Sequence, residues 1–169
     1  MKSYTRSLLF AAFSLLLFAG MAGAQNNRTS FTDANLEFTF EIPDERWKVV
    51  SRSPVSLVFT TANEGDLEIR KLTAPAATPL ADLMRKEEDK LQILRGFVAG
   101  KDENFSGALR GAVYNYEFLR SGRNMAGRFY YLRSGDTVYV LRFTAYADKL
   151  RSLRTQTDLI ARTFQIKKS

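Results

Sequence analysis

The first half of the chain contains a strict alternation of apolar and polar residues over Leu36–Ile42. An alternation of period two is typical of a strand that buries one face. Further extended segments are predicted over Trp47–Val50 and Val55–Thr61. The turn-forming residues Asn63–Asp66 then connect the second of these to the alternating residues Leu67–Arg70, which predicts a hairpin.

Apolar residues at helical spacing follow a proline-containing connector, residues 74–79. Thr78 and Pro79 have the residue types of an N-cap and of the first helical position. We expect an amphipathic helix of about 17 residues from there, with Gly96 as its C-terminal stop. Its apolar face consists of Leu80, Leu83, Met84, Leu91, Leu94 and Val98.

The second half of the chain predicts a three-stranded meander. Its strands are Ala112–Leu119, Ala126–Arg133 and Val138–Ala145, and the turn-forming runs Ser121–Asn124 and Ser134–Thr137 separate them. Short turns of this kind join antiparallel strands.

A second helix is predicted at the end of the chain, after Asp148 in the position of an N-cap. The fold class is therefore α+β, an antiparallel sheet with helices packed against it. The sequence shows no internal repeat, so we expect residues 31–169 to form one domain behind a flexible segment, residues 25–30. The apolar face of this helix consists of Leu150, Leu153, Thr157, Ile160, Ala161 and Phe164.

Residues 1–24 have the three-part layout of a secretory signal peptide. Lys2 and Arg6 precede the uncharged run Leu8–Phe18, and the small residues Ala22–Ala24 follow it. The apolar run is shorter than the roughly 20 residues that a membrane-spanning helix needs. We therefore expect the leader to be removed and the protein to be exported, to the periplasm or the exterior of a bacterial cell.

The chain of 169 residues contains no histidine and no cysteine. This excludes Ser-His-Asp triads, Cys-His dyads, the usual zinc sites and ordinary haem ligation. It also excludes a disulfide framework and a lipid-modified cysteine, and an exported domain of this size without disulfides is typical of bacteria. We expect no catalytic residue, because the sequence contains no catalytic motif. We also expect no metal and no cofactor, because the acidic turns Asn63–Asp66 and Asp102–Asn104 lack the ligand spacing of a calcium loop.

Positive charge is concentrated in the last part of the chain, where residues 105–169 carry 12 Lys and Arg against 4 Asp and Glu. Clustered guanidinium groups bind carboxylates and phosphates. Arg120, Arg123 and Arg133 are the candidate contact surface, although the turns at opposite ends of the middle strand hold Arg133 apart from the others. The alternative is that scattered cations only keep the protein soluble.

Three tyrosines are candidates for a ligand pocket, namely Tyr114, Tyr116 and Tyr139. The alternative is that they pack on the face of the sheet with their hydroxyls at its edge. Trp47, the only tryptophan, is expected to anchor the core.

The order of the elements and several anchors resemble the PsbP-like domains. The matching pieces are the first strand with Ile42–Pro43, then Trp47, the central helix, the meander and the final helix. Leu141–Ala145 leads into this final helix, and Ala161–Phe164 ends it. The family is named for an extrinsic protein of photosystem II, and its fold also occurs in a small Ran-GTPase-binding protein. The resemblance covers residues 31–166.

This resemblance implies an α/β/α sandwich with an accessory or binding role rather than catalysis. The metal-associated residues of the photosynthetic members have no counterpart here. The sequence thus predicts an exported, non-enzymatic domain that contacts a protein or an anionic envelope component, and export argues against nucleic acid. The alternatives are a small hydrolase or lyase that uses carboxylates and tyrosines, and a carrier with an apolar pocket for a small ligand.

Overall fold

The computed structural model describes residues 29–52, 56–61 and 65–167, and its main feature is a seven-stranded antiparallel sheet. The strand order is β3-β4-β5-β9-β8-β7-β6. The strands are β3 (Trp47–Arg52), β4 (Ser56–Thr61), β5 (Gly65–Thr73), β6 (Val98–Ser106), β7 (Arg110–Arg120), β8 (Arg123–Ser134) and β9 (Thr137–Tyr146).

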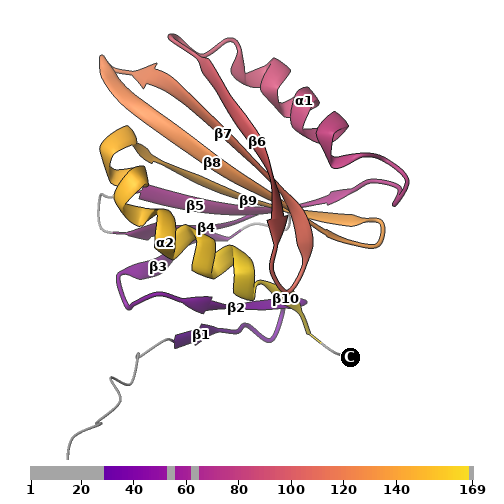
Figure 1. Ribbon diagram of the computed structural model, residues 1–169. Helices are drawn as coiled ribbons and strands as arrows, with labels where there is room; N and C mark the ends of the chain where they lie inside the picture. Colours follow the sequence, from indigo (N-terminus) through magenta and orange to yellow (C-terminus); the bar gives the residue numbers. More distant parts are fainter. Residues whose placement is uncertain (1–28, 53–55, 62–64, 168–169) are drawn as a thin grey trace, which may run out of the picture.

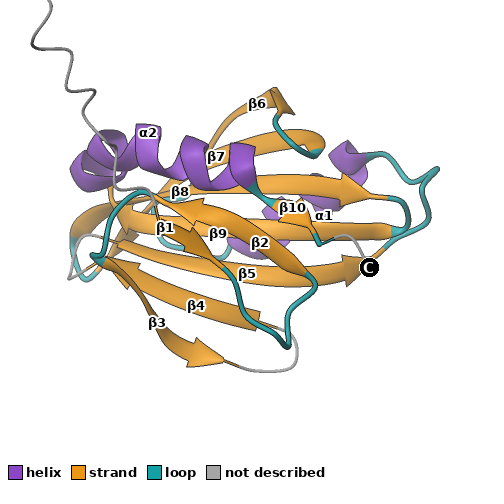
Figure 2. Cartoon of the chain, turned by 90° about the horizontal axis from the view of Figure 1, so that it is seen from below, coloured by secondary structure: helices purple, strands orange, loops and turns teal. Residues whose placement is uncertain are grey.

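Two helices cover opposite faces of this sheet (Figure 1). They are α1 (Leu80–Leu91) and α2 (Ala147–Thr163). A small antiparallel sheet of β1 (Thr29–Phe31), β2 (Phe38–Ile42) and β10 (Gln165–Ile166) lies beside α2 (Figure 2). The molecule is therefore layered, with the large sheet between the two helices.

The register of the strands divides the buried side chains into two clusters. Successive residues of a strand point to opposite faces. On β8, Tyr130 packs with Phe143 and Ile160 beneath α2, whereas its neighbour Phe129 packs with Met84 beneath α1. Each face of the sheet thus has its own hydrophobic core.

The predicted α+β class and antiparallel meander are confirmed. The alternating segment at Leu36–Ile42 contains β2, whose residues Phe38, Phe40 and Ile42 are buried. Trp47 is buried as well, and its Nε1 donates a hydrogen bond of 2.8 Å to Gln156 of α2.

The first helix is shorter than predicted. It ends at Leu91, and the chain continues in turns in which the N–H of Leu94 donates to the carbonyl of Leu91 at 2.9 Å. Gly96 has a φ of +64°, the left-handed conformation that favours glycine, but it follows these turns rather than the helix itself. Pro79 occupies the N-cap position, and no side chain caps this end.

The N-cap of the second helix lies two residues before the predicted one. Strand β9 runs directly into α2, so Tyr146 is the N-cap residue and Asp148 lies in the first turn. A carboxylate there is still favourable, because the N-terminal end of a helix carries partial positive charge.

Strand β6 is the strand of the large sheet that the sequence did not predict, and the short strands β1 and β10 of the small sheet were not predicted either. Only Phe105 of the nine residues of β6 is buried. Lys101, Asp102 and Glu103 interrupt the alternation that would mark a half-buried strand, and charged residues of this kind are common on strands at the margin of a sheet.

The expected leader, residues 1–24, lies outside the residues that the structure describes, as does most of the segment 25–30. Neither of the two described helices is long and apolar enough to cross a bilayer. The removal of the leader stays a prediction.

Candidate functional site

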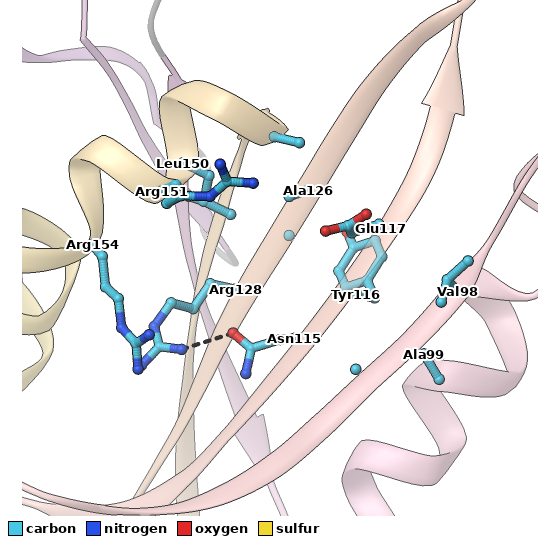
Figure 3. A pocket seen from close by; sticks show the side chains of 13 residues that line it. Val98, Ala99, Asn115, Tyr116, Glu117, Ala126, Arg128, Leu150, Arg151 and Arg154 are labelled. Atoms are coloured by element: carbon cyan, nitrogen blue, oxygen red, sulfur yellow. Dashed lines mark hydrogen bonds between the residues drawn. The ribbon is translucent and has the colours of Figure 1, made fainter.

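A cleft of about 450 Å³ lies between α2 and the strands β6, β7 and β8 (Figure 3). Three of its lining residues are arginines, Arg128 from β8 and Arg151 and Arg154 from α2, and we call it the arginine cleft. The other lining residues are Val98, Ala99, Gly100, Asn115, Tyr116, Glu117, Ala126, Gly127, Ala147 and Leu150.

Two glycines that line the cleft allow close packing of the strands beneath it. Gly127 could not be alanine without a clash, because a Cβ there would lie 2.1 Å from the ring of Tyr116 on the far face. A Cβ on Gly100 would lie 2.6 Å from the carbonyl oxygen of Asn115. Both glycines therefore allow side chain or backbone to approach closely.

Arg128 is the fixed element of the cleft, with a side chain only 8% exposed. Its Nε donates to the hydroxyl of Tyr130 at 2.7 Å, and its Nη1 donates to Oδ1 of Asn115 at 2.7 Å. Its Nη2 lies 3.2 Å from Oδ1 of Asp158 on α2. Each nitrogen of the guanidinium group thus has a partner, which holds the charge in one orientation.

The Tyr130 hydroxyl completes this network. It donates to Asp158 and lies 3.1 Å from the hydroxyl of Thr157. Burial, and then the hydrogen bond to Asp158, raise the pKa of Tyr130, so its hydroxyl remains a neutral donor. Burial alone would lower the pKa of Arg128, but Tyr130 and Asp158 raise it overall, so the guanidinium stays charged.

The other two arginines form the rim. Both Arg151 and Arg154 are exposed, and they extend from α2 over the cleft (Figure 3). Arg154 reaches across to β6, where its Nη2 lies 3.8 Å from Oε2 of Glu103. Among the described residues that line the cleft, three are cations and Glu117 is the only acid, although Arg128 and Arg154 also contact the acids Asp158 and Glu103 outside the lining.

Two of the predicted arginines lie at the tip of the β7–β8 hairpin. Arg120 and Arg123 are paired in register there, and the turn between them contains Gly122 with a φ of +76°. The guanidinium of Arg123 lies 3.5 Å from the ring centroid of Tyr146, the residue that precedes α2. Phe118 and Met125, two residues away along each strand, lie in the core beneath α1, and Arg120 lines a cleft on that side, so both arginines face away from the arginine cleft.

The third predicted arginine has a different setting. Arg133 lies at the opposite end of the β7–β8 ladder, paired with Arg110. It donates from Nη1 to the carbonyl of Pro75 at 2.9 Å and from Nη2 to the carbonyl of Thr78 at 2.8 Å. These bonds fasten the connector that leads into α1.

The predicted tyrosines do not meet in one pocket. Tyr114 and Tyr116 belong to the cluster beneath α1, whereas Tyr139 belongs to the cluster on the other face and donates a hydrogen bond to Glu37. The reason is the period of the strand, which places them on opposite sides of the sheet. All three are buried.

A second cleft of about 380 Å³ lies on the α1 side of the sheet. Arg142 lines it, and its two terminal nitrogens lie 3.2 Å from Glu68 and 3.2 Å from Glu87. The two carboxylates therefore converge on one guanidinium group, and each has a second basic partner, Arg70 for Glu68 and Lys90 for Glu87. Among the described residues no group of acidic side chains is arranged to hold a metal ion.

Arg151 and Arg154 are not among the arginines that the sequence indicated as a contact surface. Arg151 and Arg154 are three positions apart on a predicted helix, which places them on one face. That spacing is the signal that could have identified the rim. Nothing in the sequence indicates that β8 brings Arg128 beneath it.

The sequence matches no family model and no curated protein. Solved structures share its fold. Cyanobacterial PsbP (CyanoP) from Synechocystis has a TM-score of 0.60 and 16% identity, over 88% of this chain and 96% of that chain. The Ran-binding protein Mog1p of Saccharomyces cerevisiae has a TM-score of 0.61 and 8% identity, over 83% of this chain and 95% of that chain.

A protein of Bacteroides thetaiotaomicron has a TM-score of 0.58 and 16% identity over 83% of this chain. This chain spans only 48% of that longer protein. Identities of this size establish a shared fold, and a shared fold does not determine function.

Proposed function

We propose that this chain, which has the PsbP-like fold, is an exported, non-enzymatic binding domain that holds an anionic group of its partner in the arginine cleft. The observation that carries the proposal is the convergence of Arg128, Arg151 and Arg154 on one cleft. A cluster of guanidinium groups with apolar walls binds carboxylates or phosphates by paired hydrogen bonds.

The partner is a protein or a component of the cell envelope. Mog1p, which has the same fold, is described as a Ran-binding protein, and this supports a binding role for a domain of this shape. Arg120 and Arg123 lie on the other face of the sheet, where Arg120 lines the second cleft, so they do not extend the basic surface of the arginine cleft.

The two alternative functions have less support. A hydrolase built on carboxylates needs a pair of acids free to exchange protons, whereas Glu68 and Glu87 are both engaged by Arg142. A carrier needs an apolar pocket, whereas the cleft between α2 and the strands is lined by arginines.

Export is part of the proposal and rests on the leader in the sequence. Mass spectrometry of the protein from its native cell tests it. The expected mature protein begins at Gln25 and is recovered from outside the inner membrane. A native chain that begins at Met1 and is recovered with the cytosol contradicts export.

The binding role is tested by reversing one charge on the rim. Arg151→Glu is expected to weaken the binding of labelled polyglutamate and of polyphosphate by about tenfold, measured by fluorescence anisotropy. Lys86→Glu on the opposite helix changes the net charge equally and serves as the matched control.

The control is expected to bind both polyanions as the parent protein does. Affinity should also fall as salt is added, because the rim is exposed and its charges are screened. Equal weakening in the two variants, or no binding of either polyanion by the parent protein, shows that the cleft is not the contact site.

A further inference from the structure

Strand β6 is the margin of the large sheet next to the arginine cleft. It pairs with β7 on one side, and among the strands that the structure describes it has no neighbour on the other (Figure 1). A marginal strand presents a row of N–H and C=O groups that an extended chain can pair with. Its first residues, Val98, Ala99 and Gly100, also line the cleft.

The register shows which side chains of β6 face the cleft. Val98 pairs with Glu117, and Glu103 pairs with Val113, whose side chain lies in the core beneath α2. These residues therefore point toward α2. A strand added beside β6 would lie about 4.8 Å further out, and its side chains on this face would lie next to Glu103.

Arg154 connects the cleft to this margin. Its guanidinium extends from α2 as far as Glu103, at 3.8 Å, so it lies on the face where an added strand would place side chains next to Glu103. Arg151 is one helical turn before it and lines the same cleft. The cations that line the cleft are thus within reach of acidic side chains on a chain paired with β6.

The same end of the margin is apolar. Ile93 is 87% exposed and Val98 is 61% exposed, which is unusual for side chains of this size. Exposed apolar residues beside a polar rim are typical of contact surfaces. They offer a place for an apolar side chain at one end of a bound segment.

On the basis of the proposed function, we propose that the partner presents an extended acidic polypeptide segment that pairs with β6 as a further strand. Main-chain hydrogen bonds to β6 hold the segment, and its acidic side chains contact Arg154 and Arg151. Strand addition of this kind is a known mode of peptide recognition. A lipid headgroup or a polyphosphate matches the arginines but not the row of peptide groups.

A second copy of the chain is a less suitable occupant. Lys101, Asp102 and Glu103 occupy the middle of β6, and charges on a marginal strand oppose its pairing with another copy.

Two labelled peptides that alternate glutamate and threonine provide the test. In one of them every second peptide nitrogen is methylated, so the charges are kept and pairing with a strand is blocked. The purified protein is expected to bind the methylated peptide at least about tenfold more weakly, because several backbone hydrogen bonds are lost.

Hydrogen exchange locates the bound segment. The unmodified peptide is expected to slow exchange at alternate amides of β6, namely those not already bonded to β7. Strand β3, at the other margin of the sheet, is the internal control and should not change.

The outcomes separate the two proposals. Equal binding of both peptides, with no new protection on β6, overturns strand addition and leaves the proposed function standing. Failure of both peptides and of polyphosphate to bind overturns both proposals. Protection of β6 without peptide, together with dimers in sedimentation, identifies a second copy as the occupant and overturns the acidic segment.

Discussion

At the scale of single residues, two neighbouring tyrosines of β8 differ in what their hydroxyls contact. The hydroxyl of Tyr130 is bonded to Arg128, Thr157 and Asp158. The hydroxyl of Tyr131, on the opposite face, is buried and has no hydrogen-bond partner among the described residues. The two side chains are equally buried, so a comparison of their substitutions separates the contribution of the hydrogen bonds to stability from that of the buried ring.

Tyr130→Phe is therefore expected to lower the free energy of unfolding by about 2 kcal/mol, because Arg128 and Asp158 lose a buried partner. Tyr131→Phe is the matched control. It removes a hydroxyl that makes no bond, and it is expected to change stability by less than about 0.5 kcal/mol or to increase it. Urea unfolding of the parent protein and both variants measures the difference.

Equal losses in the two variants would show that the network around Arg128 adds nothing to stability. Since Arg128 is the fixed cation of the cleft, Tyr130→Phe should also weaken polyglutamate binding, whereas Tyr131→Phe should not. Weaker polyglutamate binding by Tyr131→Phe alone would contradict the assignment of the site to the α2 face.

At the scale of elements, the two helices are anchored to different extents. Helix α2 buries five residues in the core, whereas α1 buries only Met84 and Leu91. Burial of apolar surface is the main contribution that holds a helix on a sheet. Helix α1 is therefore expected to open locally more readily than α2.

Native-state hydrogen exchange tests this expectation. Amides of α1 should exchange through local opening, and those in the middle of α2 only through global unfolding. Ile160→Ala in α2 should lower the global free energy of unfolding by about 3 kcal/mol, because Ile160 is fully buried. Exchange of α1 as slow as that of α2 would contradict the difference in anchoring.

The elements that the sequence predicted are those whose burial follows a regular period. Strand β2 and helix α2 each bury one face, so the pattern of apolar residues shows them directly. Strand β6 was missed because it is exposed on both faces except at Phe105. The end of α1 was placed too late because Leu94 and Val98 continue the apolar pattern, although Leu94 lies in turns and Val98 begins β6.

The candidate site could be predicted only in part. A basic surface followed from the charge of the second half of the chain, but Arg120 and Arg123 lie on the α1 face of the sheet, away from the arginine cleft. The cleft itself depends on how α2 crosses the strands, which no local pattern records. The contacts of Arg133 could not be predicted either, because the two carbonyl groups to which it donates belong to a connector that is distant in the sequence.

At the scale of the whole molecule, the sheet buries tyrosines on both faces. Burial is the largest cause that raises the pKa of Tyr114, Tyr130, Tyr131 and Tyr139 above the ordinary value of 10.0. The folded protein thus favours the neutral phenols, whereas the unfolded chain ionises near pH 10. The stabilising contribution is complete below that pH and is lost as the pH rises above it.

We therefore expect the free energy of unfolding to fall as the pH is raised above about 10. Tyrosinate absorbance should appear together with the loss of near-ultraviolet circular dichroism, because these phenols ionise on unfolding. The chain in concentrated urea provides the reference titration. Ionisation of every tyrosine with the near-ultraviolet signal retained would contradict this expectation.

The separation of the core into two clusters has a consequence for how this protein can change over generations. Residues beneath α2 and residues beneath α1 share only the backbone of the sheet between them. Substitutions that do not touch one another act independently. Substitutions can therefore accumulate on the α1 side during evolution and give it a new role while the residues of the α2 side stay unchanged. The two faces of one fold can thus evolve separate functions.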